Sequence, residues 1–345
     1  AYGRSYAPTV DSIQDSRAAL DFVHDYRHSP SGSVGRSEGS GDFWEGSIAL
    51  RRLINEEGSL GTEPWAAGPR LLGGHNVNRA SYFKMPEGLD RVFFVSGGSE
   101  AVESAMKLAR QYALAIGQGS RWKIISRTPS YHGCTLGALA TTGYTTLTAP
   151  FEPMMRVMPK VPAPRAYLDG LDPDAEATGR HYADMLAERI EDEGPESVLA
   201  FLVEPIGGAS TGALVSPPGY LERVREICDE YGILMILDEV MTGAGRTGAF
   251  LGVDHWGVRP DIVVLSKGIG SGYAPLGAMV ADRRLVDPVL DAGGFAHGFT
   301  YAGNPLACAA GLAVLEEIDR QDLSANAAAM GEKLLARLGG LMQRH

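Results

Sequence analysis

The sequence predicts an α/β fold in which a mostly parallel central sheet carries helices on both faces, together with a smaller C-terminal domain. From residue 91 onward, short runs of apolar and β-branched residues alternate with segments of helical periodicity. This alternation is typical of a parallel sheet whose strands are buried on both faces and joined by helices. Glycine-rich, acidic or basic motifs stand where the apolar runs end. In such sheets, ligands bind beyond the carboxyl ends of the strands.

Five apolar runs are expected to form the strands of this sheet. Their β-branched and aromatic residues, and the turn residues beside them, favour strands over helices. The runs cover residues 91–96, 122–126, 199–204, 233–240 and 261–266.

Helices are expected between these strands and after them. Gly97 and Gly98 end the first strand, and Ser99 is a suitable N-terminal cap for the helix that follows it. Another helix is expected over residues 218–231. Residues 304–345 should form two amphipathic helices with a break near residues 320–323. In the first quarter of the chain, weaker helical candidates flank a Gly/Ser-rich loop at 30–42, and they cover residues 15–28 and 46–57.

Composition narrows the classes of function. A net charge of −11 argues against nucleic acid as a partner, because binding phosphates needs a basic surface. No apolar run approaches the ~18 residues of a membrane span, and the start of the chain shows no signal sequence. The three cysteines are scattered and form neither a disulfide framework nor a metal-spaced pair. We therefore expect reduced thiols in a cytoplasmic enzyme.

The motif Gly-Gly-Ser-Glu at residues 97–100 lies between a predicted strand and a predicted helix. Glycines let the backbone approach an anion, and the start of a helix offers unpaired N–H groups at the positive end of its dipole. The motif can therefore form a cup for a phosphate group. Taken alone, it is better explained as an ordinary strand-to-helix turn.

Asp238 and Lys267 stand at the ends of two other predicted strands. A carboxylate at the mouth of a buried strand needs a cationic partner, and a protonated pyridine nitrogen would supply one. A desolvated lysine amine at such a place is a nucleophile toward an aldehyde. Taken alone, Asp238 is equally explained as a helix cap or a structural ion pair, and Lys267 as a surface lysine beside a flexible loop.

The three motifs together point to one cofactor. A lysine, an acid for a ring nitrogen and a phosphate cup are the three contacts that pyridoxal phosphate requires. The sequence therefore predicts a pyridoxal-phosphate enzyme in which Lys267 carries the cofactor as a Schiff base. Asp238 would hold the ring nitrogen.

Two other patterns do not support a site. Residues 243–248 match the dinucleotide motif G-x-G-x-x-G, but glycines and a proline follow where that motif needs a helix. His24 and His28 lie one helical turn apart without a third ligand at matching spacing, so no metal site is expected.

Residues 91–320 resemble a class III aminotransferase of the fold-type I pyridoxal-phosphate superfamily. Six stretches match in order and spacing: FFVSGGSEAVESAMKLAR, SYHGCTLGALATTG, FLVEPIGGASTG, ILMILDEVMTGAGRTG, DIVVLSKGIGSGYAPLGA and HGFTYAGNPLACAAG. The resemblance implies an aspartate aminotransferase-like large domain. It also implies a homodimer with shared active sites, or a tetramer, acting on an amine or amino acid and a keto acid.

The resemblance also implies a role for each matching residue. Backbone groups of Gly98 and Ser99 would hold the phosphate. Tyr131 would stack on one face of the pyridine ring, with His132 beside it in the same motif, and Val240 would pack on the other face. Two further residues would complete the site: Glu204 would orient Asp238 as part of the catalytic group with Lys267, and Thr300 would reach the phosphate held by the neighbouring subunit.

The resemblance divides the chain into three parts and leaves some of it unmatched. Residues 1–85 form an N-terminal segment of unclear role, residues 86–310 the cofactor-binding large domain, and residues 311–345 the start of an apparently incomplete small domain. No arginine for a substrate carboxylate can be assigned. Members that act on ornithine or γ-aminobutyrate carry a second acid where this chain has Ala209.

The absence of this second acid and the GYAPLGA run after Lys267 favour the branch that transfers amino groups from ω-amino acids or amines to pyruvate. Racemases, aminomutases and decarboxylases share the same motifs and stay open as alternatives. A relative that binds the cofactor without activity is a further alternative.

Overall fold

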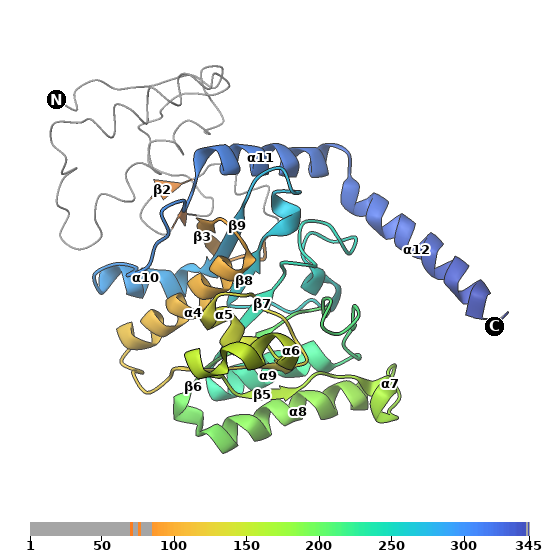
Figure 1. Cartoon of the computed structure of the whole chain (residues 1–345), viewed down its shortest axis with the longest axis horizontal. Coiled ribbons are helices and arrows are strands. Elements are labelled where there is room, and N and C mark those ends of the chain that lie inside the picture. Colours follow the sequence, from red (N-terminus) through yellow and green to blue (C-terminus); the bar gives the residue numbers. More distant parts are fainter. Residues whose placement is uncertain (1–69, 72–74, 77–84, 343, 345) are drawn as a thin grey trace.

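The computed structural model describes residues 70–71, 75–76, 85–342 and 344, and they are organised around one nine-stranded sheet. The strand order is β2-β1-β3-β9-β8-β7-β6-β4-β5 (Figure 1). β9 pairs antiparallel with both of its neighbours, and β1 pairs antiparallel with β2, whereas the other neighbouring strands are parallel. The strands are β1 Arg70–Leu71, β2 His75–Asn76, β3 Leu89–Val95, β4 Lys123–Thr128, β5 Lys160–Pro162, β6 Val198–Val203, β7 Leu234–Asp238, β8 Ile262–Leu265 and β9 Gly277–Asp282.

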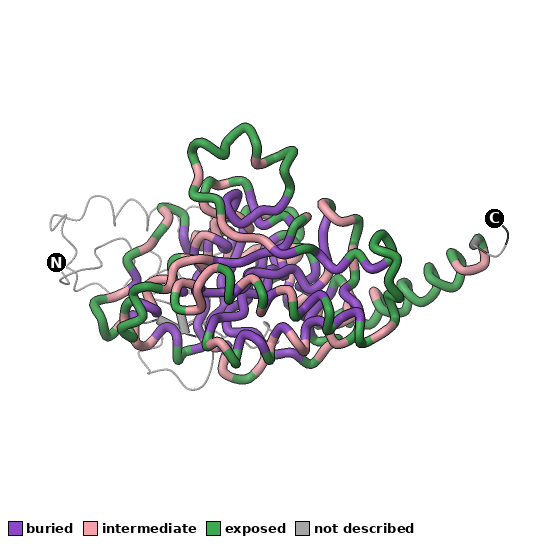
Figure 2. Tube along the Cα trace, turned by 90° about the horizontal axis from the view of Figure 1, so that it is seen from below, coloured by how far each residue is buried: buried purple, intermediate pink, exposed green. Residues whose placement is uncertain are grey.

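Helices cover both faces of this sheet, so the predicted α/β fold class is confirmed. α4 (Gly98–Ala115) and α10 (Arg283–Asp291) pack on one face, and α8 (Glu176–Glu193) and α9 (Tyr220–Tyr231) pack on the other. Successive side chains of a strand point to opposite faces. In β7, Leu234 and Ile236 accordingly join one hydrophobic core, and Met235 and Leu237 the other. Figure 2 shows the central strands as a continuous buried layer.

The five predicted strands are all present, with ends that differ by a few residues. β1, β2, β5 and β9 were not predicted. β1 and β2 have two residues each and β5 has three, which is too short for a recognisable pattern, and β9 directly follows a glycine-rich loop. The assignment of Ser99 as a helix cap is wrong. α4 begins at Gly98 and its cap is Gly97, because the backbone stays extended at Gly97.

The C-terminal part of the described chain consists of two helices, as predicted. α11 (Pro305–Arg320) packs against the main body, and α12 (Leu323–Met342) projects away from it (Figure 1). The break falls at residues 321–322, where Asp322 adopts a positive φ of 49°. The domain boundary expected near residue 310 lies inside α11, and the division into domains stays a prediction.

The remaining elements are short. They are α5 Leu136–Thr141, α6 Thr145–Thr148, η2 Ala149–Met154, α7 Ala166–Asp169, η3 Pro195–Ser197, η4 Gly252–Trp256 and η5 Lys267–Ile269. η4 is a 3-10 helix, and no α-helix directly follows residues 243–248, which agrees with rejecting a dinucleotide motif there.

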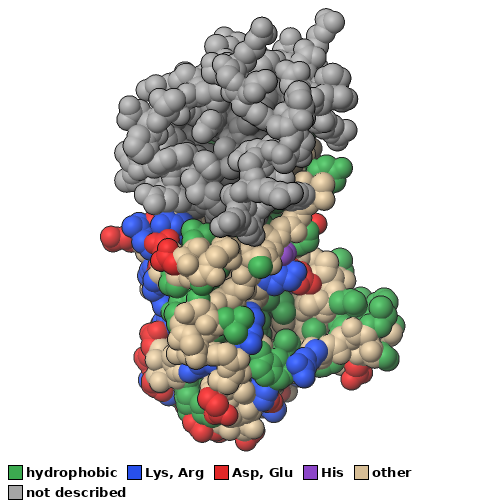
Figure 3. Space-filling view, turned by 90° about the vertical axis from the view of Figure 1, so that its left-hand side faces the viewer, with side chains coloured by type: hydrophobic (Ala, Val, Ile, Leu, Met, Phe, Trp, Pro, Cys, Tyr) green, Lys and Arg blue, Asp and Glu red, His purple; other side chains and the backbone are tan. Residues whose placement is uncertain are grey.

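Several expectations fall on the first part of the chain. The helices at 15–28 and 46–57, the loop at 30–42, and His24 and His28 lie outside the described residues. Within the described part, none of the helices is long and apolar enough to span a bilayer. On the face seen in Figure 3, outside the grey atoms, acidic and basic side chains are interspersed.

Candidate active site

Most of the residues singled out in the sequence lie at one edge of the sheet. β3, β4, β6, β7 and β8 run in the same direction, because β3 and β8 flank the antiparallel β9 and the others pair in parallel. Their carboxyl ends therefore meet at this edge. The candidate residues at the ends of these strands or shortly after them are Gly98, Ser99, Tyr131, His132, Glu204, Asp238, Val240 and Lys267.

Asp238 and His132 form a buried pair at the end of β7. Their side chains are 94% and 100% buried, and Nδ1 of His132 lies 2.9 Å from Oδ2 of Asp238. Oδ1 of Asp238 accepts a hydrogen bond from the backbone N–H of Val240 at 3.1 Å. A carboxylate can only accept hydrogen bonds, so Nδ1 of His132 carries the proton of this contact. Nε2 of His132 is buried and has no hydrogen-bond partner among the described residues.

Glu204 lies behind this pair at the end of β6. Its Oε1 accepts a hydrogen bond from the N–H of Gly208 at 3.1 Å, and its buried Oε2 has no partner among the described residues. Burial raises the pKa of Glu204, and the nearby charge of Asp238 adds to this effect. The hydrogen bond to Asp238 comes from His132. The expectation that Glu204 orients Asp238 therefore stays a prediction, carried by charge rather than by a direct bond.

Arg127 also belongs to this cluster, and the sequence analysis missed it. Its side chain is fully buried at the end of β4, where it donates to the backbone carbonyl of Glu204 at 2.7 Å and to Oγ of Ser216 at 3.3 Å. The guanidinium opposes the rise in the pKa of Glu204. The predicted strand ends at residue 126, and Arg127 stands between two polar residues, Ser126 and Thr128, so nothing in the local sequence signals that this charge is buried.

The start of α4 lies close to this cluster. The residue that caps α4 is Gly97, which has no side chain to bind the first N–H groups of the helix. A Cβ at Gly98 would lie 3.1 Å and 3.2 Å from the two methyl groups of Val240. Gly98 therefore lets the helix start approach the residue that follows Asp238 and Glu239. The amide of Ala101 is already bonded to the carbonyl of Gly97 at 3.0 Å.

The loop that carries Tyr131 and His132 packs against the same helix start. Oγ of Ser99 accepts a hydrogen bond from the N–H of Cys134 at 3.0 Å. Gly133 has a positive φ of 138°, and a Cβ there would lie 2.6 Å from Oγ of Ser99, so only glycine fits. Tyr131 is 37% exposed, and burial, Cys134 and Asp238 together raise its pKa. Tyr131 and Asp238 are therefore close enough to interact electrostatically.

Lys267 differs from its expectation. The sequence suggested a partly desolvated amine, but the side chain is exposed. The reason is that β8 ends at Leu265 and the chain turns outward, with Lys267 in the left-handed region at φ 40°. Its Nζ lies 2.8 Å from Sδ of Met241, three residues after Asp238. The amine thus points to the segment that follows the Asp238–His132 pair.

Thr300 is exposed on the loop between α10 and α11. Within the described part of this chain, none of the hydrogen bonds involves Thr300, and it is not joined to Gly98 or Ser99 of its own chain. The structure therefore brings eight of the nine candidates, Lys267 among them, to one edge of the sheet. Thr300, the ninth, lies on a separate loop.

The cluster suits pyridoxal phosphate. Nε2 of His132 and Oε2 of Glu204 are buried and have no partners in the part of the chain that the structure describes, and they lie next to a buried carboxylate that can bind a protonated ring nitrogen. The glycine at position 98 leaves room where a side chain would collide with Val240. Within the described residues, no group of three or more His, Cys, Asp or Glu side chains is placed to hold a metal ion.

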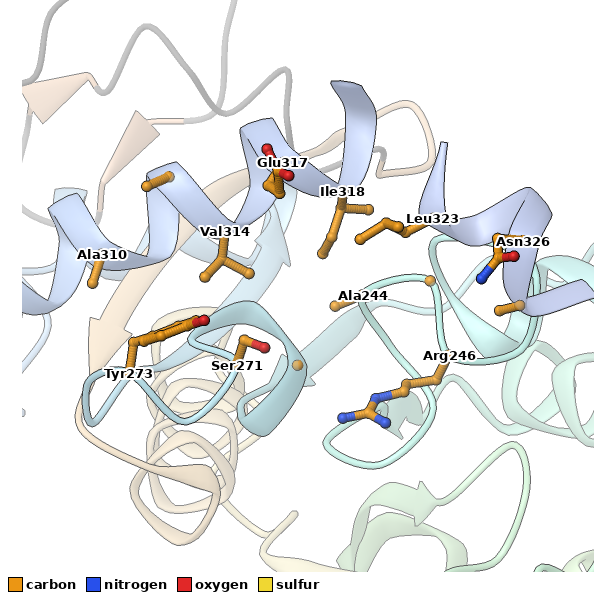
Figure 4. A pocket seen from close by; sticks show the side chains of 14 residues that line it. Ala244, Arg246, Ser271, Tyr273, Ala310, Val314, Glu317, Ile318, Leu323 and Asn326 are labelled. Atoms are coloured by element: carbon orange, nitrogen blue, oxygen red, sulfur yellow. The ribbon is translucent and has the colours of Figure 1, made fainter. Parts of the chain in front are cut away.

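A cavity of about 930 Å³ lies beside the site, between α11, the start of α12 and the loops after β7 and β8. Ser271 and Tyr273 face Ala310 and Val314 of α11 across it, with Arg246 on the adjacent loop (Figure 4). Gly268 also lines the cavity, which therefore reaches the residue next to Lys267.

Known proteins resemble this chain over most of its length. The model of the family "Aminotransferase class-III" matches residues 76–345. A probable aminotransferase of Mycobacterium tuberculosis is 47% identical over 240 residues, which are 69% of this chain and 51% of the relative. The β-alanine–pyruvate aminotransferase of Pseudomonas aeruginosa is 36% identical over 266 residues, or 74% of this chain and 58% of the relative.

A solved structure agrees with these relatives. It is the ω-transaminase of Pseudomonas jessenii in complex with PMP, with a TM-score of 0.71 and 30% identity over 94% of this chain and 66% of the other. The chain spans 51% to 58% of the length of the two curated relatives above. Because the family model covers well over half of the chain, the protein belongs to the class III aminotransferases.

Proposed function

We propose that this chain is a pyridoxal-phosphate-dependent aminotransferase that moves an amino group from an ω-amino acid or amine to a keto acid, with pyruvate as the expected acceptor. The observation that carries the proposal is the buried Asp238–His132 pair at the sheet edge, with Lys267 pointing to the segment beyond it. Burying a carboxylate is costly, and a cationic ring nitrogen next to Asp238 would offset this cost further than its bonds to His132 and Val240 do. The family relationship supports the same cofactor.

Several residues would hold the cofactor. The first amides of α4, at Gly98 and Ser99, would bind its phosphate. Tyr131 and Val240 would enclose the ring, and Asp238 would bind its nitrogen. When bound, pyridoxal phosphate supplies an electron sink for the charge left when a substrate carbon loses its proton.

The protein groups have separate tasks in this proposal. Asp238 keeps the ring nitrogen protonated, and His132 holds Oδ2 of Asp238 through Nδ1 at 2.9 Å. Glu204 interacts electrostatically with both His132 and Asp238, and Arg127 holds the backbone carbonyl of Glu204. Lys267 Nζ would hold the cofactor, and its free amine would move a proton between atoms of the substrate as a general base and acid.

The choice of substrates rests on two further points. Ala209 stands where family members that act on ornithine or γ-aminobutyrate are expected to carry an acid. The relatives include proteins named for β-alanine with pyruvate and for ω-transamination, which supports ω-amino or amine donors.

We further propose that the active species is a homodimer, as such or within a tetramer, in the cytoplasm. Thr300 would contact the phosphate held by the partner subunit. Support comes from its exposed position on a loop that is well fixed at other points, while its hydroxyl makes none of the hydrogen bonds found among the described residues.

One experiment tests the function. The purified 345-residue chain is titrated with a panel of amines and amino acids while its visible absorbance is recorded, and alanine formation from pyruvate is measured. We expect loss of the lysine-bound cofactor band with ω-amino donors, and borohydride should fix the cofactor to Lys267. Lys267→Ala should abolish the band, and Asp238→Asn should keep cofactor while losing most turnover.

The outcomes separate the alternatives. Racemisation or loss of carbon dioxide without amino transfer would contradict the proposal, and so would a reduced adduct on another lysine. Near-normal turnover in Asp238→Asn would show that this carboxylate is structural only.

A further inference from the structure

The loop that presents Thr300 is attached to α4 and β3 at several points. Near its start, the N–H of Ala296 donates to Oε1 of Gln111 on α4 at 2.9 Å. At its end, the N–H of Gly303 donates to the carbonyl of Phe94 on β3 at 3.2 Å. Between these two anchors lies His297, three residues before Thr300. On the N-terminal side of Thr300, the side chains of His297 and Phe299 make the contacts nearest to it among the described residues.

The hydrogen bonds of His297 determine its tautomer. The ammonium of Lys107 can only donate, and it lies 3.4 Å from Nδ1 of His297, so Nδ1 is an acceptor. Nε2 therefore carries the proton and donates to Oγ of Ser104 at 3.0 Å. Ser104 in turn donates to the carbonyl of Glu100 at 2.7 Å. Each donor in this chain of contacts meets an acceptor, and the chain ends in the first turn of α4.

The imidazole is also enclosed by aromatic rings. The ring of Phe299 lies 4.8 Å from it at 83°, and the rings of Phe295 and Phe93 lie at 5.3 Å and 5.7 Å. Phe299 is the residue directly before Thr300. Burial, helped by Lys107 and opposed by Glu103, lowers the pKa of His297 to about 4, so the ring is neutral at ordinary pH. The neutral ring is the form that the contacts with Lys107 and Ser104 require.

The supports of this loop lie on a single face of α4. Ser104, Lys107 and Gln111 are spaced by three and four residues, so they line the same side of the helix. Ser104 is fully buried, and the helix that carries it begins with Gly98 and Ser99. The first turn of α4 would therefore bind the cofactor phosphate of its own subunit. The same helix also holds the loop whose Thr300 would reach the cofactor phosphate of the partner subunit.

We propose that His297 is a positioning residue that holds the Thr300 loop on α4 and so sets the position of Thr300 for the partner subunit's phosphate. This inference rests on the proposed cofactor and dimer. The effect should cross the dimer interface. Loss of the His297 contacts in one subunit should impair cofactor binding in the partner subunit, and the site of the altered subunit should depend on His297 of the partner.

Two variants remove the contacts without removing the loop. His297→Phe keeps a ring among Phe93, Phe295 and Phe299 but loses both hydrogen bonds. Ser104→Ala removes the acceptor of Nε2, together with the bond from Ser104 to the carbonyl of Glu100, and keeps His297 itself. His181→Phe, on the exposed side of α8, is the matched control. Hydrogen exchange of the cofactor-free chain should be faster across residues 293–303 in both variants and unchanged in the control.

Cofactor affinity gives the second measurement. The dissociation constant of pyridoxal phosphate should rise about five- to tenfold in both variants, as expected for one lost hydrogen bond. In a Thr300→Ala background, His297→Phe should add nothing, because it acts through Thr300. Equal affinity in the wild type and His297→Phe, or a full additional loss in the Thr300→Ala background, would overturn the inference.

Hybrid dimers test the direction. When a His297→Phe subunit is mixed with a Lys267→Ala subunit, the hybrid dimer has Lys267 only in the His297→Phe subunit. The site that contains this lysine receives Thr300 from the other subunit, in which His297 is unchanged. This site should bind the cofactor like the wild type. Affinity as weak as in the His297→Phe homodimer would mean that His297 acts within its own chain. If the wild-type protein held no lysine-bound cofactor, the proposed function would be refuted. The hydrogen-exchange experiment would still decide whether His297 anchors the loop.

Discussion

α4 and α12 are helices of similar length with very different surroundings. α4 has 18 residues and buries a continuous apolar face, with Val102, Ala105 and Leu108 fully inaccessible. α12 has 20 residues, and its large apolar side chains are exposed, with Leu335 at 71% and Leu334 at 58%. The contrast is visible in Figure 2, where α12 extends from the body without a buried stripe.

The difference concerns function as well as packing. Because one face of α4 is fixed on the sheet, its polar side chains hold two loops in place. Glu103 accepts hydrogen bonds from the loop after Tyr131, and Ser104 and Lys107 contact the loop before Thr300. A helix can position other groups only when its own position is determined. The polar residues of α12 have no such role among the described contacts.

The largest difference is expected from a matched pair of leucine truncations. Leu108→Ala should lower the free energy of unfolding by about 2–5 kcal/mol, because it leaves a cavity in a fully buried core. Leu335→Ala should change it by less than about 0.5 kcal/mol, because that side chain is already in contact with water. Urea denaturation of both variants measures the effect. Equal losses would mean that α12 is packed in solution.

A smaller effect is expected from the polar face. Oε1 of Glu103 accepts hydrogen bonds from Thr135 at 2.8 Å, from the N–H of Gly137 at 2.9 Å and from that of Ala138 at 3.3 Å. Glu103→Ala should cost about 1–3 kcal/mol, since it leaves these donors without their partner. Glu332→Ala on α12 is the control and should be neutral. Faster hydrogen exchange at residues 131–138 would locate the loss, and unchanged exchange there would contradict it.

The loop on α4 should also make stability depend on pH. The pKa of His297 falls from 6.5 to about 4 in the folded protein, so the unfolded chain binds more protons between these values. The His297 contribution is therefore complete above pH 6.5 and decreases as the pH falls toward 4. His297→Phe should flatten this part of the profile. Parallel profiles for the two proteins would show that His297 is not shielded from protonation.

The smallest effect is expected in α12, with the opposite sign. A Cβ at Gly331 would meet nothing within 4 Å, so Gly331→Ala should favour the helix by about 0.5–1 kcal/mol. Gly137 provides the contrast, because a Cβ there would lie 2.5 Å from Oε1 of Glu103. Circular dichroism should show increased helicity for the first variant. Gly137→Ala should lower the melting temperature, and a rise would contradict the packing of α4.

The sequence alone determined the features that depend on local patterns. Apolar runs bounded by turn residues identified five buried strands, and they correctly placed Asp238 and Lys267 near the ends of two of them. Helical periodicity located α11, α12 and the break between them. These features follow from burial and backbone preferences within about ten residues, so no knowledge of distant partners was needed.

The tertiary structure alone decided what depends on residues far apart in the chain. His132 and Asp238 are 106 positions apart, and Ser104 and His297 are 193 positions apart. The buried pairing of Arg127, the insertion of β9 between β3 and β8, and the outward turn at Lys267 are of the same kind. The apolar pattern of a helix likewise does not reveal whether another element covers it. Both α4 and α12 have apolar residues, but only α4 is covered by the sheet. Hydrogen bonding and burial are properties of the assembled fold, and a linear pattern specifies only which residues are able to take part.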